Sequence, residues 1–351
     1  MEPPATDEVL IRREGRTGRI TMNRPKAINA LTYAMVGRIW DALLAWRDDP
    51  AVEIVTIDGA GERGLCAGGD VRSLYESRAQ GSGHARAFWR DEYRLNALIG
   101  RYPKPCVALQ GGIVMGGGIG LSGHARHRIV TERSQLAMPE TGIGLIPDVG
   151  GTWLLARAPG EAGIYLGLTG ESMRAADAIH AGFSDAFVPV AQLPRLIGRL
   201  SDPRGGAVAA VIAEYAQPPG DSELARRAEG IDRMFAGATV EAIMASLESS
   251  RLDWAVQALT ALAQKSPKSM KLTLAAIRNA RALPSLEEAL MVEYRLTVRL
   301  FEDGEFPEGV RALLVDKDRS PRWSPPDLPG VTDDLVARYL APLPASGELS
   351  F

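Results

Sequence analysis

The pattern of apolar and polar positions predicts strands and helices in alternation from the start of the chain. Short apolar runs at 8–13 and 18–22, separated by a glycine-containing turn, predict a β-hairpin. Apolar side chains at helical spacing between 32 and 46 predict a helix that begins at Thr32. A compact apolar run at 52–58 predicts a buried strand that leads into a glycine-rich loop.

The same succession of strand, loop and helix continues through about residue 190. A helical pattern at 85–100 is followed by an apolar run at 105–109 that predicts another strand, and then by a second glycine-rich loop. Strands that alternate with helices are typical of an α/β fold. We therefore expect a core of repeated α/β units over residues 1–190.

The remaining part of the chain, residues 191–351, has helical segments separated by glycine- and proline-containing breakers, and a proline-rich stretch near its end. A longer helix is expected at 285–302, where Ser285 and Glu288 have the spacing of a capping box. The sequence thus predicts a helical C-terminal region appended to the core. Shorter helices are expected at 192–200, 206–215, 239–247 and 252–264.

Length and charge narrow the class of protein. With 351 residues, of which 46% are hydrophobic, the chain is long enough to bury a substantial core. A formal net charge of -3 gives no basic surface in bulk, so nucleic acid is not expected as a partner.

The sequence also bears on location and metal chemistry. The N-terminal segment lacks the apolar core of a signal peptide, and no stretch approaches the roughly 18 apolar residues of a membrane-spanning helix. Cys66 and Cys106 show no metal-ligand spacing, and they are expected to be small buried thiols. We expect a cytoplasmic protein with no membrane partner and no metal site. The histidines, at 84, 124, 127 and 180, form no ligand set with the cysteines.

The segment MPETGIGLIPDVGG holds the leading catalytic candidates. Glu140 and Asp148 stand eight positions apart in a stretch too rich in glycine to form core. Two carboxyl groups beside an exposed backbone are a candidate acid/base pair. The alternative is structural, with each carboxylate capping the helix or turn that follows it.

Two further glycine clusters follow apolar runs that predict buried strands. They are Ala67-Gly68-Gly69-Asp70 and Gly116-Gly117-Gly118. Glycine lets the backbone approach a ligand and aim its N–H groups, and two such amides make an oxyanion hole. The alternative is tight packing between a strand and a helix. If the loops converge, they form one site with Glu140 and Asp148.

Residues 118–123 formally satisfy the dinucleotide-binding pattern G-x-G-x-x-G. The pattern lies late in the chain, after a loop that already turns at 111–112, and no acidic residue ends a clear strand about 20 positions later. A nucleophile elbow is excluded because His124 stands where glycine is needed. Ser122 is therefore expected to pack within a helix.

Four segments together resemble the crotonase (enoyl-CoA hydratase/isomerase) superfamily. Further segments resemble one branch of it, the 3-hydroxyisobutyryl-CoA hydrolases, so that the resemblance covers nearly the whole chain. The superfamily segments are 20–31, 65–72, 111–122 and 138–151, and the branch segments are 92–96, 266–274, 293–318 and 320–328.

The resemblance implies a spiral of ββα repeats that binds an acyl-CoA thioester. On matching positions, the backbone amides of Gly69 and Gly117 would hold the thioester carbonyl. CoA is part of the substrate, and no separate cofactor is implied. Members often form trimers or hexamers, but the extended C-terminal region of this chain could either build or block that interface, so whether the chain is a homo-oligomer stays open. The residues implied along the adenine and pantetheine are Lys26, Ala27, Ile28, Ala67, Gly68 and Asp70.

Chemistry separates the activities of the superfamily. Hydratases place a second glutamate two residues after the glycine triplet, where this chain has Gly120. Hydration uses two paired carboxylates, whereas thioester hydrolysis needs one attacking or water-activating carboxylate and an oxyanion hole. Glu140 matches the remaining glutamate, and Asp148 matches an acid of the hydrolase branch. Glu92 is an ordinary helix glutamate by its pattern, but it matches a substrate-site glutamate of that branch.

The sequence therefore predicts an acyl-CoA thioester hydrolase. The substrate implied is 3-hydroxyisobutyryl-CoA, an intermediate of valine breakdown. Two alternatives stay open at this point. One is an enoyl-CoA hydratase or isomerase, and the other is an acyl-CoA-binding protein without turnover.

Overall fold

The computed structural model describes residues 7–351, which divide into two compact units. Each unit is assembled from segments that are not consecutive in the chain, so the division differs from a single boundary at residue 190. The expected boundary stays a prediction about the chain's two regions. Of the described residues, the first unit comprises 7–69, 94–136 and 173–222, and the second comprises 70–93, 137–172 and 223–351.

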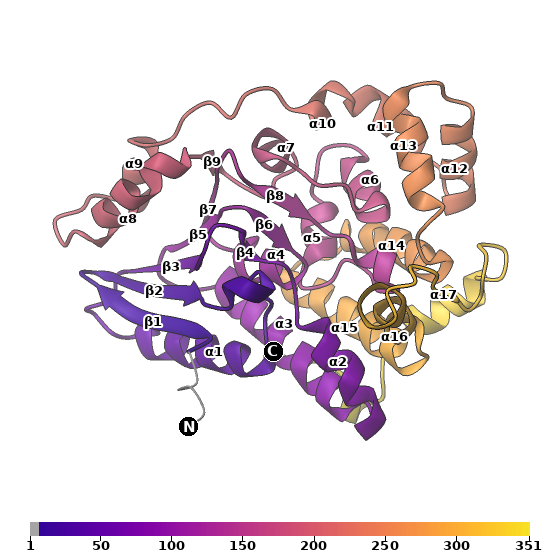
Figure 1. Cartoon of the computed structure of the whole chain (residues 1–351), viewed down its shortest axis with the longest axis horizontal. Coiled ribbons are helices and arrows are strands. Elements are labelled where there is room, and N and C mark those ends of the chain that lie inside the picture. The colour runs from indigo at the N-terminus through magenta and orange to yellow at the C-terminus, as the bar shows by residue number, and fades with distance from the viewer. Residues whose placement is uncertain (1–6) are drawn as a thin grey trace. The chain divides into compact units, whose positions relative to one another are not determined.

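A six-stranded sheet forms the frame of the first unit (Figure 1). The order of its strands is β1-β2-β3-β5-β7-β9, with β1 and β2 antiparallel and all other neighbours parallel. The expected hairpin and the strands expected at 52–58 and 105–109 are confirmed. The bounds are β1 Val9–Glu14, β2 Thr17–Met22, β3 Ile54–Gly59, β5 Cys106–Gln110, β7 His127–Val130 and β9 Ala186–Phe187.

A second sheet explains the repeat that the sequence pattern indicates. It has three strands in the order β4-β6-β8. Three times in succession, one strand enters the six-stranded sheet, the next enters this smaller sheet, and a helical segment follows. The predicted α/β class with ββα repeats is confirmed. The small strands are β4 Gly64–Cys66, β6 Ile113–Met115 and β8 Gln135–Ala137, and the helices that follow β4 and β6 include α2 Val71–Ser77, α3 Gly83–Gly100 and α4 Gly117–Ser122.

Helices α8 and α9 pack on the six-stranded sheet of the first unit. Leu196, Leu200 and Val211 on these helices join Val107 and Ile129 on the strands in one buried apolar cluster. The helices expected at 192–200 and 206–215 are therefore present and are held by apolar burial. Their bounds are α8 Leu193–Ser201 and α9 Val208–Ala213, and the other short helices of the unit are η1 Pro25–Ala27, α7 Ala175–His180 and η4 Val190–Gln192.

Helix α1, Tyr33–Arg47, begins where the sequence predicts. The hydroxyl of Thr32 accepts a hydrogen bond from the N–H of Met35 at 3.2 Å, which satisfies a free donor of the first turn. Beyond the C-terminal end of α1, the ammonium of Lys104 donates to the carbonyl oxygens of residues 46, 49 and 52, each at 2.6 Å. This lysine ties the end of the helix to the start of β5.

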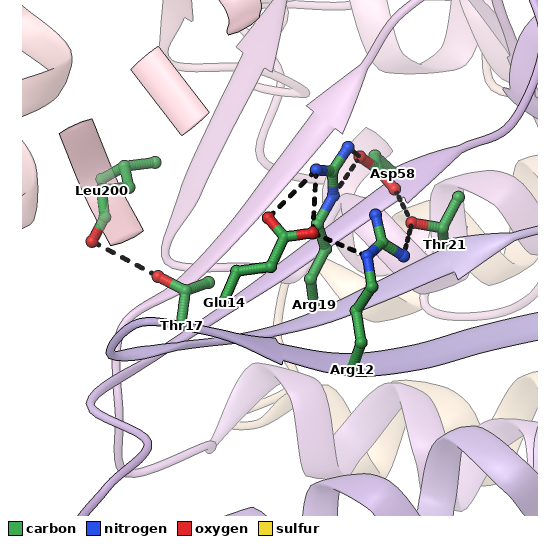
Figure 2. Close-up of polar contacts among 7 residues, drawn as sticks. All are labelled: Arg12, Glu14, Thr17, Arg19, Thr21, Asp58 and Leu200. Carbon is green, nitrogen blue, oxygen red and sulfur yellow. Dashed lines mark hydrogen bonds and ion pairs between the residues drawn. The ribbon is translucent and has the colours of Figure 1, made fainter. Parts of the chain in front are cut away.

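Charged residues on one face of the hairpin neutralise each other across three strands (Figure 2). Arg12 and Arg19 are direct cross-strand partners, an arrangement that is unfavourable for like charges. Glu14 accepts from Arg12 at 2.6 Å, and Asp58 on β3 accepts from Arg19 at 2.5 Å and from the hydroxyl of Thr21 at 2.5 Å. The carboxylates therefore stabilise a pairing that the two arginines alone would oppose.

The second unit is largely helical. An aromatic cluster lies among its helices, where the ring of Tyr165 meets the rings of Phe235 at 5.2 Å and Trp254 at 6.1 Å, both edge to face. No helix within residues 7–351 is long and apolar enough to cross a membrane. The elements are η2 Arg78–Gln80, η3 Glu140–Ile143, α5 Gly151–Leu155, α6 Ala162–Thr169, α10 Glu223–Arg226, α11 Ala228–Phe235, α12 Val240–Glu248, α13 Asp253–Leu262, α14 Pro267–Ala280, α15 Leu286–Glu302, α16 Glu305–Val310, η5 Arg311–Val315, α17 Asp333–Leu340 and η6 Ala345–Gly347.

The helices expected at 239–247, 252–264 and 285–302 are confirmed as α12, α13 and α15. Ser285 caps α15 by accepting from the N–H of Glu288 at 3.2 Å, which is the serine half of the expected capping box. Helix α14 was not predicted from the sequence, because it has no apolar stripe confined to one face. Instead, 10 of its 14 residues are buried, among them a lysine, a serine and a threonine.

Gly118 lies where a side chain has no room. A Cβ atom at this position would lie 2.3 Å from the carbonyl oxygen of Cys66 at the end of β4. The structural interpretation of the second glycine cluster, tight packing between a strand and a helix, is therefore correct for Gly118. Ser122 also packs within the helix as expected, since its hydroxyl donates to the carbonyl of Gly118 at 2.7 Å.

We predict that Gly118→Ala lowers the free energy of unfolding by about 1–3 kcal/mol, because the added methyl group overpacks a backbone contact. Gly37→Ala is the matched control, since Gly37 is exposed in α1 and a Cβ there meets nothing within 4 Å. This control is expected to raise stability by about 0.5–1 kcal/mol. Urea unfolding of both variants checks the prediction, and equal stability changes would contradict it.

Candidate active site

The two glycine loops nominated from the sequence lie next to each other in the first unit. Strands β4 and β6 are parallel neighbours, and the loops follow their carboxyl ends. A Cβ atom built on Gly68 would lie 3.5 Å from the carbonyl oxygen of Met115 and 3.9 Å from the amide nitrogen of Gly117. The structure therefore brings the loop that contains Gly69 to the loop that begins with Gly117.

The turn at 26–28 belongs to the same neighbourhood. Ile28 has a left-handed backbone, with φ 48°, and its carbonyl accepts the N–H of Ala67 at 3.0 Å. Lys26 and Ala27 are exposed beside it. Asn29, which no sequence pattern singles out, has a buried side-chain amide that donates to the carbonyl of Gly64 at 2.8 Å. Asn29 thereby joins this turn to β4.

Asp70 comes directly after the first glycine loop. Its carboxylate accepts from the N–H of Ser73 at 3.3 Å and caps helix α2. This contact gives Asp70 a structural role in the second unit, whereas Ala67, Gly68 and Gly69 belong to the first unit.

The nominated carboxyl groups are buried together in the second unit. The exposed fractions are 2% for Glu92 on α3, 4% for Glu140 on η3 and 5% for Asp148 in the loop before α5. Burial disfavours ionisation, and neighbouring carboxylates disfavour it further. The three residues are therefore acids that hold protons at higher pH than exposed carboxyl groups do.

Glu140 begins the short helix η3 and carries an unsatisfied oxygen. Its Oε2 atom has no hydrogen-bond partner among residues 7–351. Burial, and after it the charge of Asp148, raises the pKa of Glu140 well above its usual value, while Lys265 acts in the opposite direction. Burial in turn lowers the pKa of Lys265. Glu140 thus presents a free carboxyl oxygen in a place where a proton can be taken up or released.

Asp148 is held by a buried tyrosine. The hydroxyl of Tyr93 donates to Oδ2 of Asp148 at 2.7 Å and lies 2.9 Å from the hydroxyl of Thr297 on α15. Burial raises the pKa of Asp148 to about 6, against the effect of the Tyr93 hydrogen bond, which lowers it. Asp148 therefore changes its protonation close to neutral pH.

Glu92 is not the ordinary surface glutamate that its helical pattern alone indicates. Its side chain is buried, and its Oε1 atom has no hydrogen-bond partner among residues 7–351. Burial, and then the charge of Asp148, raises the pKa of Glu92 well above its usual value. Glu92 therefore lies near enough to Asp148 for the charge of Asp148 to act on it, while its place in a substrate site stays a prediction.

The capping interpretation of Glu140 and Asp148 is wrong. The residue before η3 is Pro139, and the N-cap of α5 is Gly150, so neither carboxylate occupies a cap position. The first turn of α5 is instead satisfied by Glu293 on α15, which accepts from the N–H groups of Gly150 and Thr152. Burial raises the pKa of Glu293 to about 8, and these donors lower it.

Three residues near Asp148 are not predicted from the sequence: Glu293, Tyr93 and Thr297. One signal was present: Glu293 and Thr297 stand one helical turn apart on an otherwise apolar, buried stripe of α15. A glutamate within such a stripe requires partners. The stripe comprises Ala289, Leu290, Glu293, Tyr294, Leu296, Thr297, Leu300 and Phe301.

The described part of the chain contains no candidate metal site. Within residues 7–351, no group of three or more histidine, cysteine, aspartate or glutamate side chains is arranged to hold a metal ion. Cys66 and Cys106 are both buried thiols outside any disulfide bond, as expected, and burial raises the pKa of Cys106 to about 12. Neither thiol is a candidate nucleophile.

Comparison with known proteins gives consistent relatives over nearly the full chain. A family model described as enoyl-CoA hydratase/isomerase matches residues 17–340. The mitochondrial 3-hydroxyisobutyryl-CoA hydrolase of Danio rerio is 42% identical over 98% of this chain and 92% of its own length. The mitochondrial protein of the same name from Homo sapiens is 39% identical over 99% and 92%, respectively.

Solved structures with the same fold carry other names. An enoyl-CoA hydratase from Rhodobacter sphaeroides 2.4.1 superposes with a TM-score of 0.93 at 47% identity, covering 98% of this chain and 100% of that one. A carnitinyl-CoA dehydratase from Mycobacterium thermoresistibile has a TM-score of 0.93 at 45% identity, covering 99% of both chains. The similar proteins therefore agree on fold and on CoA thioesters and differ in the named reaction.

We predict that stability depends on pH through Asp148. The pKa of this carboxyl is about 6 in the folded chain and about 3.9 in an unfolded chain. The folded chain therefore binds a proton that the unfolded chain has lost. This contribution to stability is complete below about pH 4 and is lost as the pH rises through about 6.

Urea unfolding from about pH 4 to about pH 7 checks this prediction. The wild type should lose stability relative to Asp148→Asn as the pH rises. Asp202→Asn is the control: hydrogen bonds from Arg204 lower the pKa of Asp202, so its contribution is lost only at lower pH. A constant difference between the wild type and Asp148→Asn across the range would show that Asp148 titrates normally.

Proposed function

The chain belongs to the enoyl-CoA hydratase/isomerase family, and we propose that within it the chain hydrolyses the thioester of 3-hydroxyisobutyryl-CoA, giving 3-hydroxyisobutyrate and CoA. One observation carries the proposal: Glu140 and Asp148 are buried together, while the position of a second hydratase glutamate is occupied by Gly120. The names of the full-length relatives support the same reaction.

In this proposal Glu140 is the reacting carboxylate. It either attacks the thioester carbon, forming an anhydride that water then opens, or takes a proton from the water that attacks. In both routes a C–O bond forms, the C–S bond breaks, and the thiolate of CoA receives a proton. The unpartnered Oε2 atom supports this role in either route. The raised pKa supports the second route, in which Glu140 holds the proton taken from water and returns it to sulfur. In the first route Glu140 carries no proton when the C–S bond breaks, and the thiolate takes its proton from water.

Asp148 and Glu92 would bind the polar part of the acyl group. A 3-hydroxyl group can donate to one carboxylate and accept from a protonated one. The neighbouring positions of these two acids, with an unpartnered Oε1 on Glu92, support such a pair. The hydroxyl thus distinguishes this substrate from a plain acyl thioester, because buried polar groups left unpaired reject analogues that lack it.

The backbone amides of Gly69 and Gly117 would stabilise the oxyanion. The close approach of Gly68 to Gly117 supports this role. A lost oxyanion donor typically costs about 3–4 kcal/mol in the barrier. The adenine and pantetheine of CoA are proposed to follow the turn at 26–28 and the loop at 67–70, whose contacts would be made largely by the backbone.

An enoyl-CoA hydratase is the second candidate. It is favoured by the names of the two solved structures given above, an enoyl-CoA hydratase and a carnitinyl-CoA dehydratase. Addition of water across a double bond requires a base for water and an acid for the α-carbon. In this chain Gly120 stands at the position of the second hydratase glutamate, so Asp148 would have to take over the role of that glutamate. Hydrolysis needs no second acid at that position, which is why it is preferred.

Three further properties belong to the proposal. The proposed hydrolysis consumes only water and the thioester, so the proposal includes no cofactor. Homo-oligomer formation stays open, and a cytoplasmic location remains a prediction from the sequence. The curated relatives are named as mitochondrial proteins, a location that would suit valine breakdown equally well.

We predict that thiol release from 3-hydroxyisobutyryl-CoA is fast in the wild type and falls at least about 100-fold in Glu140→Gln, because the amide neither attacks nor accepts the proton. Release of CoA is followed with a thiol reagent. The same preparations are given crotonyl-CoA, and loss of its conjugated enoyl absorbance reports hydration.

Glu248→Gln, an exposed position at the end of α12, is the matched control and should keep full activity. Rapid enoyl loss with little thiol release would support the hydratase instead. Tight binding of the acyl-CoA without either reaction would identify a binding protein. Normal thiol release by folded Glu140→Gln would remove Glu140 from the mechanism.

A further inference from the structure

Helix α15 carries a fully buried carboxyl group that the proposed reaction leaves without a role. Glu293 is 0% exposed. Its Oε2 atom accepts the N–H of Gly150 at 2.7 Å, and its Oε1 atom accepts the N–H of Thr152 at 2.9 Å and also the hydroxyl of Thr152. All three donors belong to Gly150 and Thr152, which stand two and four positions after Asp148.

The backbone held by Glu293 is a strained one. Val149 has a φ of 55° and Gly150 a φ of 79°, so two successive residues adopt the left-handed conformation. Glycine does so readily, but a β-branched residue does so only when its surroundings impose it. The carboxyl group of Glu293 supplies such a restraint, because it binds the amides on both sides of Gly151.

A second connection joins α15 to the side chain of Asp148. The carbonyl oxygen of Glu293 accepts the hydroxyl of Thr297 at 2.6 Å. That hydroxyl lies 2.9 Å from the hydroxyl of Tyr93, which donates to Asp148 at 2.7 Å. One turn of α15 therefore contacts both the backbone after Asp148 and the tyrosine that holds its carboxyl group.

Capping alone does not require this arrangement. Helices α1, α12, α14 and α17 are capped by a serine or threonine immediately before them in the chain. Helix α5 is capped instead by a carboxyl group 141 residues away. Burying a carboxyl group costs free energy, and a serine or threonine would satisfy these backbone amides at lower cost. The carboxyl group of Glu293 therefore suggests a second role, which is to fix the backbone that follows Asp148.

We propose that Glu293 is a positioning residue for the reaction, holding the 149–152 backbone so that the carboxyl group of Asp148 stays fixed against Tyr93 and Glu92. The inference rests on the proposed function for its kinetic consequence. Its structural half, the restraint of the loop by Glu293, can be measured without any substrate.

Hydrogen exchange tests that structural half. In Glu293→Gln the new NH₂ group cannot accept from the amide that its carboxylate oxygen bound, so at least one of the two contacts is lost. The amides of Gly150 and Thr152 should exchange at least about 10-fold faster than in the wild type. Glu302→Gln is the matched control on the same helix, since Glu302 pairs with Arg86 near the surface. Unchanged protection in Glu293→Gln would overturn the proposal.

A double-mutant cycle tests whether Glu293 acts through Asp148. Glu293→Gln alone should lower kcat for 3-hydroxyisobutyryl-CoA about 100-fold, the effect of a small misplacement of a reacting group, with a smaller change in KM. In an Asp148→Asn background the same substitution should lower kcat by less than about twofold. A purely structural role would give the full reduction in both backgrounds, and this result would overturn the proposal.

Thr152 provides a milder pair of variants in case Glu293→Gln does not fold. Thr152→Val removes one of the three donors with little change of shape, whereas Thr152→Ser retains the hydroxyl. We expect kcat to fall about 10-fold in the valine variant and to be recovered in the serine variant. Equal activities in the two variants would show that the hydroxyl contact to Glu293 does not matter.

The two proposals fail in different ways. If the wild type releases no thiol from 3-hydroxyisobutyryl-CoA, the proposed function is wrong, and the exchange measurement still decides whether Glu293 restrains the loop. If thiol release is fast but Glu293→Gln leaves both exchange and kcat unchanged, the proposed function stands and the positioning role is wrong.

Discussion

The burial of four carboxyl groups in the second unit is the constraint on which the candidate site depends. Glu92, Glu140, Asp148 and Glu293 are all removed from water, where an unpaired carboxylate is strongly disfavoured. The unit meets this cost in two ways. All four acids have raised pKa values, which favour the protonated form, and Glu293 in addition receives three hydrogen-bond donors.

The same burial also makes these acids suitable for proton transfer. A carboxyl group that titrates near neutral pH can take a proton from water and give it to a leaving group within one turnover. By contrast, hydrogen bonds from Arg204 lower the pKa of the half-buried Asp202, which makes such a carboxylate a poorer proton donor near neutral pH. Removal from water is therefore the cause both of the energetic cost of burying these acids and of their suitability for proton transfer.

In the first unit the corresponding constraint is the close approach of backbone to backbone. The loops after β4 and β6 can lie together only because residues such as Gly118 have no side chain. Close contact between loops leaves their amides as the available polar groups. This explains why the two glycine clusters combine a structural role, tight packing, with the proposed functional one.

The difference between the named reactions of similar proteins comes down to few positions. The chain shares fold and nearly full length with proteins named as hydrolases, hydratases and a dehydratase. All of these names imply a CoA thioester and a polarised carbonyl group. Addition of water to a double bond needs a pair of acid/base groups, whereas thioester hydrolysis needs one carboxylate and an oxyanion hole. Under the proposed function, Gly120 and Asp148 therefore carry more information about the reaction than the fold does.

The sequence by itself determined the features that depend on local pattern. Hydrophobic periodicity predicted the hairpin, helices α1 and α15 and the α/β class, and residue type predicted the glycine loops and the pair of acids in the 138–151 segment. Local signals suffice there, because strand and helix periods and capping act over a few neighbouring residues.

Only the tertiary structure decided the environment of those residues. It buried Glu92, which its helical pattern alone presents as an ordinary glutamate, and it joined Glu293 to Gly150 across 143 positions in the chain. It also set the protonation of Asp148, since a pKa depends on desolvation and on charges brought close by folding. Residue types are local, whereas burial and the partners of a buried group depend on the whole fold.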